Sequence, residues 1–315
     1  MTSPFAGLSA FPLTPLPGDR LDEPAFARLV RRVAGSGVDS ITALGSTGSY
    51  AYLTAKERAR VARLAVENAD GTPVLVGIGA LRTSHVLRHA DDAAAAGAAG
   101  LLLAPVSYQP LTDDDVLELF RTVTERSGLP VVVYDNPGTT HFRFSTELYG
   151  RIAELPGIAS IKIPPLPADP AEARARVEQI RAVIPEYVTL GISGDASAAA
   201  GLASGCDAWY SVLAGTLPEP ALRIMRAAQQ GRAQQDRPRD GQAEDGGAED
   251  AAAESERLAP LWRLFAEFGS LRVIAAIAEE LGLVPHRSLP LPLQGLTEVQ
   301  RTRVADTLDV LGLNG

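Results

Sequence analysis

The sequence predicts a closed (β/α)8 TIM barrel followed by a C-terminal helical extension. From about residue 40, a short apolar run, a turn rich in Gly, Pro or Ser and an amphipathic segment recur, with a new apolar run about every 30 residues. Alternation of this kind is typical of parallel sheets covered by helices. The chain is also 315 residues long, which is enough for a barrel and an extension.

Eight apolar runs are expected to form the strands. They are Gly7–Pro12, Ser40–Leu44, Pro73–Gly77, Gly100–Ala104, Pro130–Tyr134, Ile158–Ile163, Val188–Gly191 and Ala208–Val212. Eight such strands alternating with helices favour a closed barrel, and an open doubly wound sheet is the alternative.

The segments between the strands carry helix start and stop signals. Thr54 and Glu57 have the spacing of a capping box before Arg58–Asn68. Thr112 precedes three aspartates, which suits the free N–H groups of a helix N-terminus. Glycines end several of the helical patterns, namely Gly97, Gly128 and Gly205.

The composition changes abruptly after the eighth unit, whose helix is expected at about Pro218–Gln230. Residues 231–257 contain Gln, Asp, Glu, Gly and Ala with almost no large apolar side chain. Such a segment buries too little surface to offset the entropy of ordering. It is therefore predicted to be a disordered acidic insertion.

Helical periodicity returns after the insertion. The expected helices are Leu258–Phe268, Leu271–Leu281 and Thr297–Leu311. The chain is thus divided into a barrel at 1–230, the insertion, and a C-terminal helical region at 258–315 that forms a cap or an oligomerisation element.

Charge and composition exclude some classes of partner. The formal net charge is -9 and the pI is near 5.1, and no dense stripe of Lys and Arg is available to neutralise a nucleic-acid backbone. No apolar stretch approaches the roughly 20 residues that span a bilayer, and Met1–Phe5 lacks the pattern of a secretory signal. Cys206 is the only cysteine, so no internal disulfide forms. We expect a cytoplasmic protein without a nucleic-acid or membrane partner.

Lys162 carries the clearest chemical signal. The chain has 29 Lys plus Arg residues, of which only Lys56 and Lys162 are lysine. Lys162 lies between two isoleucines in a short apolar run, where an ammonium group would be poorly solvated. Loss of solvation lowers the pKa of an amine and leaves it neutral, so that it can attack a carbonyl. The alternative is a lysine at a strand end whose amine reaches solvent.

Other candidates follow from the rule that reactive groups of such barrels lie at the carboxyl ends of the strands. Tyr134 ends the fifth strand, where it is either a site residue or an aromatic at the edge of the core. The loop Gly45–Ser49 offers hydroxyls and backbone N–H groups for a carboxylate or phosphate, and a plain turn is the alternative. Pro105–Tyr108 and Ser193–Asp195 follow the fourth and seventh strands. All of these segments are expected to face one mouth.

Competing site patterns are incomplete. His85 and His89 have the spacing of zinc ligands, but no further His or acidic pattern completes a site, so we expect a solvated helix face and no metal. Gly191–Asp195 resembles a nucleophile elbow, yet Asp195 stands where the second Gly is needed.

Five short motifs occur in a specific order and spacing. Thr14–Leu16 is similar to T-P-F, Gly45–Ser49 to G-T-T-G-E, Val133–Pro137 to Y-N-x-P, Ser160–Lys162 to G-I-K and Ser193–Asp195 to S-G-D. Through these motifs the chain resembles the dihydrodipicolinate synthase / N-acetylneuraminate lyase family of pyruvate-dependent class I aldolases. The resemblance covers nearly the whole chain outside the acidic insertion.

The resemblance implies a role for each matching residue. Lys162 would form an imine with the ketone of pyruvate or another 2-oxo acid, and Ser46 and Thr47 would hold the carboxylate of that substrate. Tyr134 would transfer protons during imine formation and during C–C bond making or breaking. The backbone at Tyr210 matches a further pyruvate contact. No cofactor is implied, and the family suggests a homotetramer.

The sequence departs from the family pattern at three places. The family's tyrosine pair is replaced within residues 105–110, so the relay hydroxyl is expected from Ser107 or from Tyr108. Thr139 occupies the place of an arginine that receives the carboxylate of the synthase's aldehyde, and a threonine cannot make a bidentate charged contact. Ser49 replaces the glutamate of G-T-T-G-E. These changes concern the second substrate more than the Schiff base.

We therefore expect a Schiff-base-forming lyase that acts on pyruvate or another 2-oxo acid, with an unidentified aldehyde or sugar acid as its second substrate. The catalytic candidates are Lys162, Tyr134, Ser46 and Tyr108, and the substrate-binding candidates are Thr47, Ser107, Thr139 and Tyr210. One alternative is a true 4-hydroxy-tetrahydrodipicolinate synthase of lysine biosynthesis. An alternative of another functional class is a non-catalytic barrel that binds a 2-oxo acid.

Overall fold

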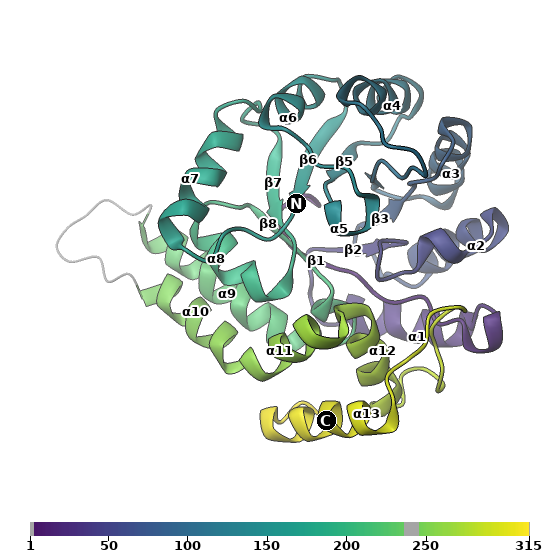
Figure 1. Ribbon diagram of the computed structural model, residues 1–315, viewed down its shortest axis with the longest axis vertical. Coiled ribbons are helices and arrows are strands. Elements are labelled where there is room, and N and C mark those ends of the chain that lie inside the picture. The colour runs from purple at the N-terminus through teal and green to yellow at the C-terminus, as the bar shows by residue number, and fades with distance from the viewer. Residues whose placement is uncertain (1–2, 236–245, 315) are drawn as a thin grey trace.

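Eight parallel strands close into a barrel in the computed structural model, which describes residues 3–235 and 246–314 (Figure 1). The strands are β1 (Gly7–Ala10), β2 (Ser40–Ala43), β3 (Val74–Gly77), β4 (Gly100–Leu103), β5 (Val131–Tyr134), β6 (Ile158–Ile163), β7 (Thr189–Ile192) and β8 (Ala208–Ser211). Each strand pairs with the next along the chain, and β8 pairs with β1. The predicted barrel is therefore confirmed, and the open sheet is wrong.

The strands are short and apolar because both of their faces are buried. Side chains alternate between the two faces of a strand. One set forms a cluster inside the barrel that includes Leu75, Leu102, Val132 and Tyr210. The other set, which includes Ile41, packs outward against the helices in a larger core. The interior is thus filled by side chains except at the carboxyl ends of the strands, where a cavity opens.

Helices surround the barrel (Figure 1). The helices from the start of the chain to the end of the eighth unit are α1 (Glu23–Ala34), α2 (Ala55–Glu67), α3 (Thr83–Ala96), α4 (Asp113–Arg126), α5 (Pro137–Thr140), α6 (Thr146–Ala153), α7 (Pro170–Arg181), α8 (Ala198–Ala203) and α9 (Pro218–Gln235). The short α5 is not part of the surrounding ring, because it lies at the mouth of the barrel. Thr54 forms the predicted capping box with Glu57, and Thr112 forms a second one with Asp115. Because Thr54 is the N-cap, α2 begins three residues before the predicted start.

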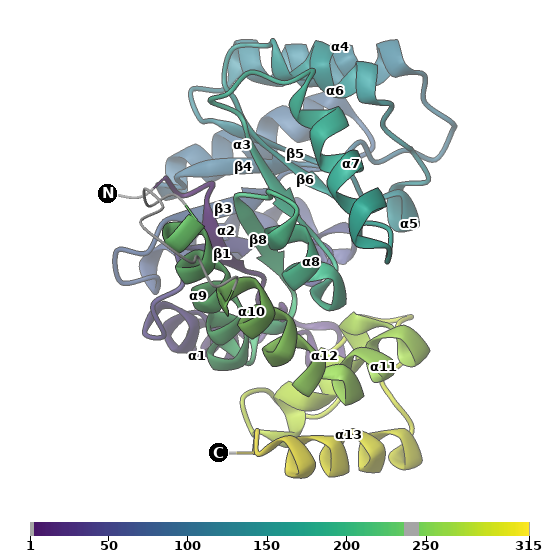
Figure 2. The same ribbon diagram turned by 90° about the vertical axis from the view of Figure 1, so that its left-hand side faces the viewer.

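The predicted disordered insertion at 231–257 is wrong where the structure describes this segment. Helix α9 continues to Gln235, and a further helix, α10, occupies Gly246–Arg257. Residues 236–245 of the predicted insertion lie outside the described residues. Figures 1 and 2 show α9 and α10 side by side at the edge of the barrel.

Glycine explains how these two helices pack without large apolar side chains. A Cβ added to Gly247 would lie 2.2 Å from the Cα of Gly231. The two backbones therefore approach more closely than any larger residue allows. Ala251 of α10 is buried as well. Close packing of small residues here replaces the burial of large ones, which is why the composition misled the prediction.

The C-terminal region forms α11 (Ala259–Phe268), α12 (Ser270–Glu280) and α13 (Glu298–Leu311), close to the predicted positions. Figure 2 shows them gathered at one end of the molecule. Helix α11 contacts the short turn Asp195–Ser197 that follows β7, so it lies at the carboxyl-terminal mouth of the barrel. Within residues 3–235 and 246–314, no helix is both long and apolar enough to cross a membrane.

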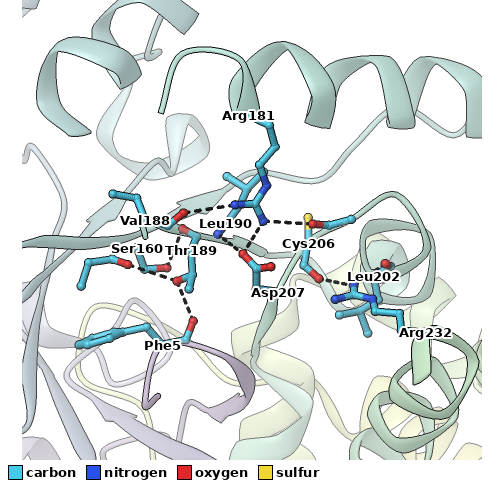
Figure 3. A network of polar contacts seen from close by, with 12 residues as sticks. Phe5, Ser160, Arg181, Val188, Thr189, Leu190, Leu202, Cys206, Asp207 and Arg232 are labelled. Atoms are coloured by element: carbon cyan, nitrogen blue, oxygen red, sulfur yellow. Dashed lines mark hydrogen bonds and ion pairs between the residues drawn. The ribbon is translucent and has the colours of Figure 1, made fainter. Parts of the chain in front are cut away.

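The amino-terminal ends of β7 and β8 are joined by polar contacts at the opposite end of the barrel (Figure 3). The Arg181 guanidinium forms an ion pair with Asp207. It also donates to the carbonyl oxygens of Val188 and Gly205 at 3.2 and 3.1 Å. Asp207 accepts the N–H of Leu190 at 2.8 Å. This network ties α7 to two strands on the side of the barrel away from the cavity.

Candidate active site

A cavity of about 850 Å³ opens at the carboxyl ends of the strands. Lys162, Tyr134 and Phe11 line it from the barrel, and Trp262 and Phe265 line it from α11. Six of the eight predicted site residues lie on its wall, namely Lys162, Tyr134, Ser46, Thr47, Thr139 and Tyr210. The strand ends therefore bring together residues that are far apart in the sequence, as the barrel rule predicts.

Lys162 lies on β6 with its amine enclosed by rings. The residue is 4% exposed, and its Nζ lies 3.9 Å from the ring centroid of Tyr134 and 4.7 Å from that of Phe11. Tyr134 is its register partner on the neighbouring strand β5. Burial lowers the pKa of Lys162 from 10.5 to about 7, against the opposing attraction of Asp195. A large fraction of the amine is therefore neutral near pH 7.

The other neighbour of Lys162 is Gly191 on β7, and this glycine makes room for Tyr210. A Cβ at position 191 would lie 2.3 Å from Cε2 of the Tyr210 ring. The Tyr210 ring packs edge-on against Phe11, and its hydroxyl donates to Ser160 Oγ at 2.7 Å. Tyr210 thus supports the floor of the cavity with its ring, while its hydroxyl is already engaged.

Three polar side chains form a hydrogen-bonded triangle beside the amine. Ser46 Oγ and the Tyr134 hydroxyl lie 3.2 Å apart. Asn136 Nδ2 donates to the Tyr134 hydroxyl at 2.8 Å and to Ser46 Oγ at 3.1 Å. Burial raises the pKa of Tyr134 to about 12, although the hydrogen bonds from Ser46 and Asn136 act in the opposite direction. Tyr134 is therefore protonated at neutral pH and available as a proton donor.

Asp195 is the only Asp or Glu among the described residues that line the cavity. It is buried, and its Oδ1 accepts hydrogen bonds from Trp209 Nε1 at 3.1 Å and from Ser211 Oγ at 2.8 Å. Its Oδ2 accepts the N–H of Leu213 at 3.1 Å. Burial raises the pKa of Asp195 to about 6, while these donors and Lys162 lower it. Asp195 therefore ties β7 to the segment after β8, and its hydrogen-bonding capacity is largely used.

The loop after β2 brings Ser46, Thr47 and Ser49 to the cavity. Thr47 and Ser49 are buried, and Ser49 has a φ of 53°, which is unusual for a residue other than glycine. Ser49 Oγ has no hydrogen-bond partner among the described residues. Thr139 lies on the first turn of α5, where its hydroxyl donates to the carbonyl of Asn136 at 3.3 Å.

Two predicted site residues do not reach this cavity. Tyr108 and Ser107 are not among the described residues that line it. Tyr108 is 90% exposed, and the Ser107 hydroxyl donates to the carbonyl of Gln109. Neither hydroxyl therefore completes the Ser46–Tyr134 pair within one chain, although Val106 of the same loop lines the cavity.

The predicted solvated helix face is confirmed for His85 and is wrong for His89. His85 is exposed, but His89 is buried, and its Nδ1 has no partner in the described part of the chain. Burial and the nearby cation of Arg58 lower the pKa of His89 to about 4. His89 therefore remains neutral at pH 7 on the inner face of α3.

Asn136, Trp262 and Phe265 are among the cavity-wall residues that the sequence did not predict. Asn136 stands at the variable position of Y-N-x-P, where the motif demands no residue type. Trp262 and Phe265 belong to an apolar helix face whose partner a periodic pattern does not identify. Their spacing of three residues on α11 does show that they share a face, and this is the signal that was available.

Comparisons with known proteins agree with this geometry. Residues 4–239 match the model of the dihydrodipicolinate synthetase family. A 4-hydroxy-tetrahydrodipicolinate synthase of Methylococcus capsulatus is 35% identical over 223 residues, which cover 69% of this chain and 74% of the relative. The crystal structure of dihydrodipicolinate synthase from Agrobacterium tumefaciens is 43% identical, with a TM-score of 0.89 and 98% of both chains covered.

The fold also matches more distant structures. The chloride-inhibited dihydrodipicolinate synthase of Acinetobacter baumannii, solved in complex with pyruvate, has a TM-score of 0.83. It is 24% identical, and the match covers 98% of this chain and 99% of that one. At this identity the likeness concerns the barrel and its C-terminal helices.

Proposed function

This chain belongs to the dihydrodipicolinate synthetase family of lyases, and we propose that it acts on pyruvate or a related 2-oxo acid through an imine on Lys162. As a member of this family the protein is an enzyme of the class I aldolase type, so the alternative of a non-catalytic binding barrel is wrong. The pyruvate bound to the Acinetobacter baumannii enzyme supports the choice of 2-oxo acid.

The environment of Lys162 is the observation that carries the proposal. An amine attacks a ketone only in its neutral form, and burial between two aromatic rings gives Lys162 a pKa of about 7. The adjacent Tyr134 hydroxyl remains protonated and can deliver a proton to the oxygen that leaves. A nucleophile and a proton donor are thus available at the same pH.

The reaction then proceeds in balanced steps. The Lys162 amine adds to the ketone carbon, and the carbinolamine loses water with a proton supplied through Tyr134, leaving a cationic imine. Loss of a proton from the adjacent carbon gives an enamine, which forms a C–C bond with an aldehyde. Hydrolysis of the resulting imine releases the product and the free amine. Hydroxyls and N–H groups of the loop at Ser46 and Thr47 hold the substrate carboxylate.

The proposal is tested by trapping the imine. The protein is incubated with pyruvate and borohydride, and its intact mass is measured. We expect one reduced adduct on the wild type and on Lys56→Ala, and none on Lys162→Ala. Lys56 is a matched control because it is the only other lysine and lies exposed on α2. A wild-type chain left unmodified by several 2-oxo acids would contradict the proposal.

A true 4-hydroxy-tetrahydrodipicolinate synthase is the second candidate. It is favoured by the 43% identity to the Agrobacterium tumefaciens synthase. Thr139 opposes it, because the cavity then lacks the bidentate partner that an aldehyde carboxylate needs. Rapid condensation of pyruvate with aspartate semialdehyde would establish this candidate, and the absence of condensation would remove it.

We also propose a homotetramer in which the exposed Tyr108 acts in the cavity of a neighbouring copy. This arrangement would supply the hydroxyl that its own chain does not bring to the Ser46–Tyr134 pair. It assigns Ser107 a structural part in the same loop, through its hydrogen bond to Gln109.

A further inference from the structure

We propose that the second substrate is an aldehyde with an uncharged, flat remote end, and that an aromatic aldehyde is the class the cavity takes. This inference rests on the proposed imine at Lys162 and names the partner of that imine. It is drawn from the charges and the shape of the cavity wall.

The wall offers no countercharge to an anionic aldehyde. Among the described residues that line the cavity, Lys162 is the only Lys, Arg or His, and Asp195 is the only Asp or Glu. Lys162 is consumed by the imine, and Asp195 would repel an anion. Thr139, at the edge of the mouth, is uncharged. Burying an unpaired carboxylate costs several kcal/mol, on the order of its lost solvation, so a second carboxylate is disfavoured here.

The outer wall is instead apolar and aromatic. Trp262 and Phe265 project from one face of α11, with ring centroids 5.6 Å apart and an interplanar angle of 57°. The Trp262 indole N–H already donates to the carbonyl of Ser255 at 2.9 Å, so what Trp262 presents to the cavity is the apolar surface of its ring. Val106 and Leu271 line the same cavity from the barrel and from α12.

These side chains are only partly buried, which fits a surface that a ligand covers. An aryl group attached to the reacting carbonyl would lie between the Lys162 amine and the rings of Trp262 and Phe265 on α11. The enamine carbon would then attack the aldehyde carbon, the aldehyde oxygen would take up a proton, and water would release the aryl-substituted product from Lys162. No oxidant, reductant or further reactant is needed.

A matched pair of aldehydes tests the inference. 4-Nitrobenzaldehyde and 4-carboxybenzaldehyde have nearly the same shape and differ in charge. With pyruvate, we expect kcat/KM for the nitro compound to exceed that for the carboxylate by about 100-fold, because the carboxylate would be buried unpaired. Thr139→Arg should narrow this ratio about tenfold by supplying the missing cation. Aspartate semialdehyde serves as an aliphatic anionic comparison.

The aromatic wall is tested separately. Trp262→Ala should raise KM for 4-nitrobenzaldehyde about tenfold and leave borohydride trapping of pyruvate unchanged. Val299→Ala, on the exposed face of α13, is the control and should change neither. If the pyruvate adduct forms but the carboxylated aldehydes react as well as the nitro compound, this inference fails and the imine proposal stands. Absence of the adduct would overturn both.

Independently, the hydrogen bonds of Asn136 point to a positioning residue that fixes the hydroxyls of Ser46 and Tyr134. The two hydrogens of its amide are directed at these two oxygens, at 3.1 and 2.8 Å. Each hydroxyl is thereby held as an acceptor towards Asn136. One of them donates across the 3.2 Å between them, and the remaining O–H is free for the substrate. An amide does not release a proton at these pH values, so Asn136 orients the pair and does not relay protons itself.

The backbone holds Asn136 in place for this task. It precedes α5, and its carbonyl accepts the N–H groups of Thr139 and Thr140, both at 3.0 Å. Its side chain therefore projects from a fixed helix start towards the end of β5. Asn136, at the variable position of Y-N-x-P, thus adds a third polar side chain of the same chain to Ser46 and Tyr134.

Two variants separate orientation from simple packing. Asn136→Leu removes the donor at similar size, and we expect kcat to fall at least about tenfold with KM for pyruvate within about threefold. Asn136→Asp accepts when ionised and donates when protonated, so its activity relative to wild type should rise as the pH falls through the pKa of the new carboxyl. The activity of Asn136→Leu relative to wild type should not change with pH. Wild-type kcat in both variants, or equal and pH-independent losses, would overturn the assignment.

Discussion

Burial of the Lys162 amine opposes folding at neutral pH. In the unfolded chain this lysine keeps its proton up to its ordinary pKa of 10.5, whereas in the folded chain it loses it at about 7. Between these values the unfolded state binds more protons, so stability rises with pH through this window. The cost is fully present below about pH 7, and at about 1.4 kcal/mol per pH unit it amounts to at most about 5 kcal/mol.

Lys162→Met should therefore stabilise the protein while preventing the proposed imine. We expect the free energy of unfolding to rise by a few kcal/mol near pH 6 and by much less near pH 10, as measured by denaturant titration. Lys56→Met, at an exposed position, should change it by less than about 0.5 kcal/mol at either pH. Equal destabilisation by Lys162→Met at both pH values would mean that the amine is solvated.

Removal of the Tyr134 hydroxyl should affect turnover far more than stability. Tyr134→Phe keeps the ring over Lys162 but loses the proton donor, so we expect turnover to fall about 100-fold. The lost hydrogen bonds to Ser46 and Asn136 should cost only about 1–2 kcal/mol. Steady-state rates and thermal melts check the two effects, with the exposed Tyr187→Phe as control. Unchanged turnover would remove Tyr134 from the mechanism.

The sequence predicted the site residues whose chemistry is unusual for their surroundings. A lysine in an apolar strand and a tyrosine at a strand end are informative because burial of a polar group needs a reason. Asn136 and His89 were not predictable in this way. An asparagine next to a proline is ordinary turn composition, and the burial of one histidine on α3 depends on which face of that helix meets its neighbours.

Packing of α9 against α10 yields a prediction at the scale of elements. Gly247→Ala would normally stabilise a helix by about 1 kcal/mol. Here the new Cβ would lie 2.2 Å from the Cα of Gly231, so the helices must separate, and we expect a net loss of about 1–3 kcal/mol. Thermal melts measure the sign. Gly128→Ala, which meets nothing within 4 Å, should be nearly neutral, and stabilisation by Gly247→Ala would refute the close contact.

Strands and helices were predictable to the extent that burial follows a period. Strand β6 coincides with its predicted run because isoleucines mark both of its ends, at Ile158 and Ile163. Helix α10 was not predicted, because it packs through glycine and alanine and the prediction relied on large apolar side chains. Even the position of α11 over the mouth needed the three-dimensional structure, since periodicity defines a face but not its partner.

The polar network that joins the strands and the cavity with the candidate site residues lie at opposite ends of the barrel axis. Arg181 and Asp207 bind the amino ends of strands together, while Lys162, Tyr134 and Asn136 line the cavity at the carboxyl ends. Such a division allows the loops and C-terminal helices to set the substrate without altering the network at the other end. The proposed homotetramer is not encoded in any single motif, because an interface forms between surfaces that are complementary between copies.

Exchange of sites between copies provides the test at this scale. If Tyr108 acts in a neighbour's cavity, Lys162→Ala and Tyr108→Phe chains should each be nearly inactive alone. A pair made of one Lys162→Ala chain and one Tyr108→Phe chain would contain one site with both an intact Lys162 and an intact Tyr108. Random pairing in co-expressed, doubly tagged protein should therefore restore about one quarter of wild-type activity. Light scattering should report about four chains per particle, and activity no greater than the sum of the separate variants would show that Tyr108 does not act across an interface.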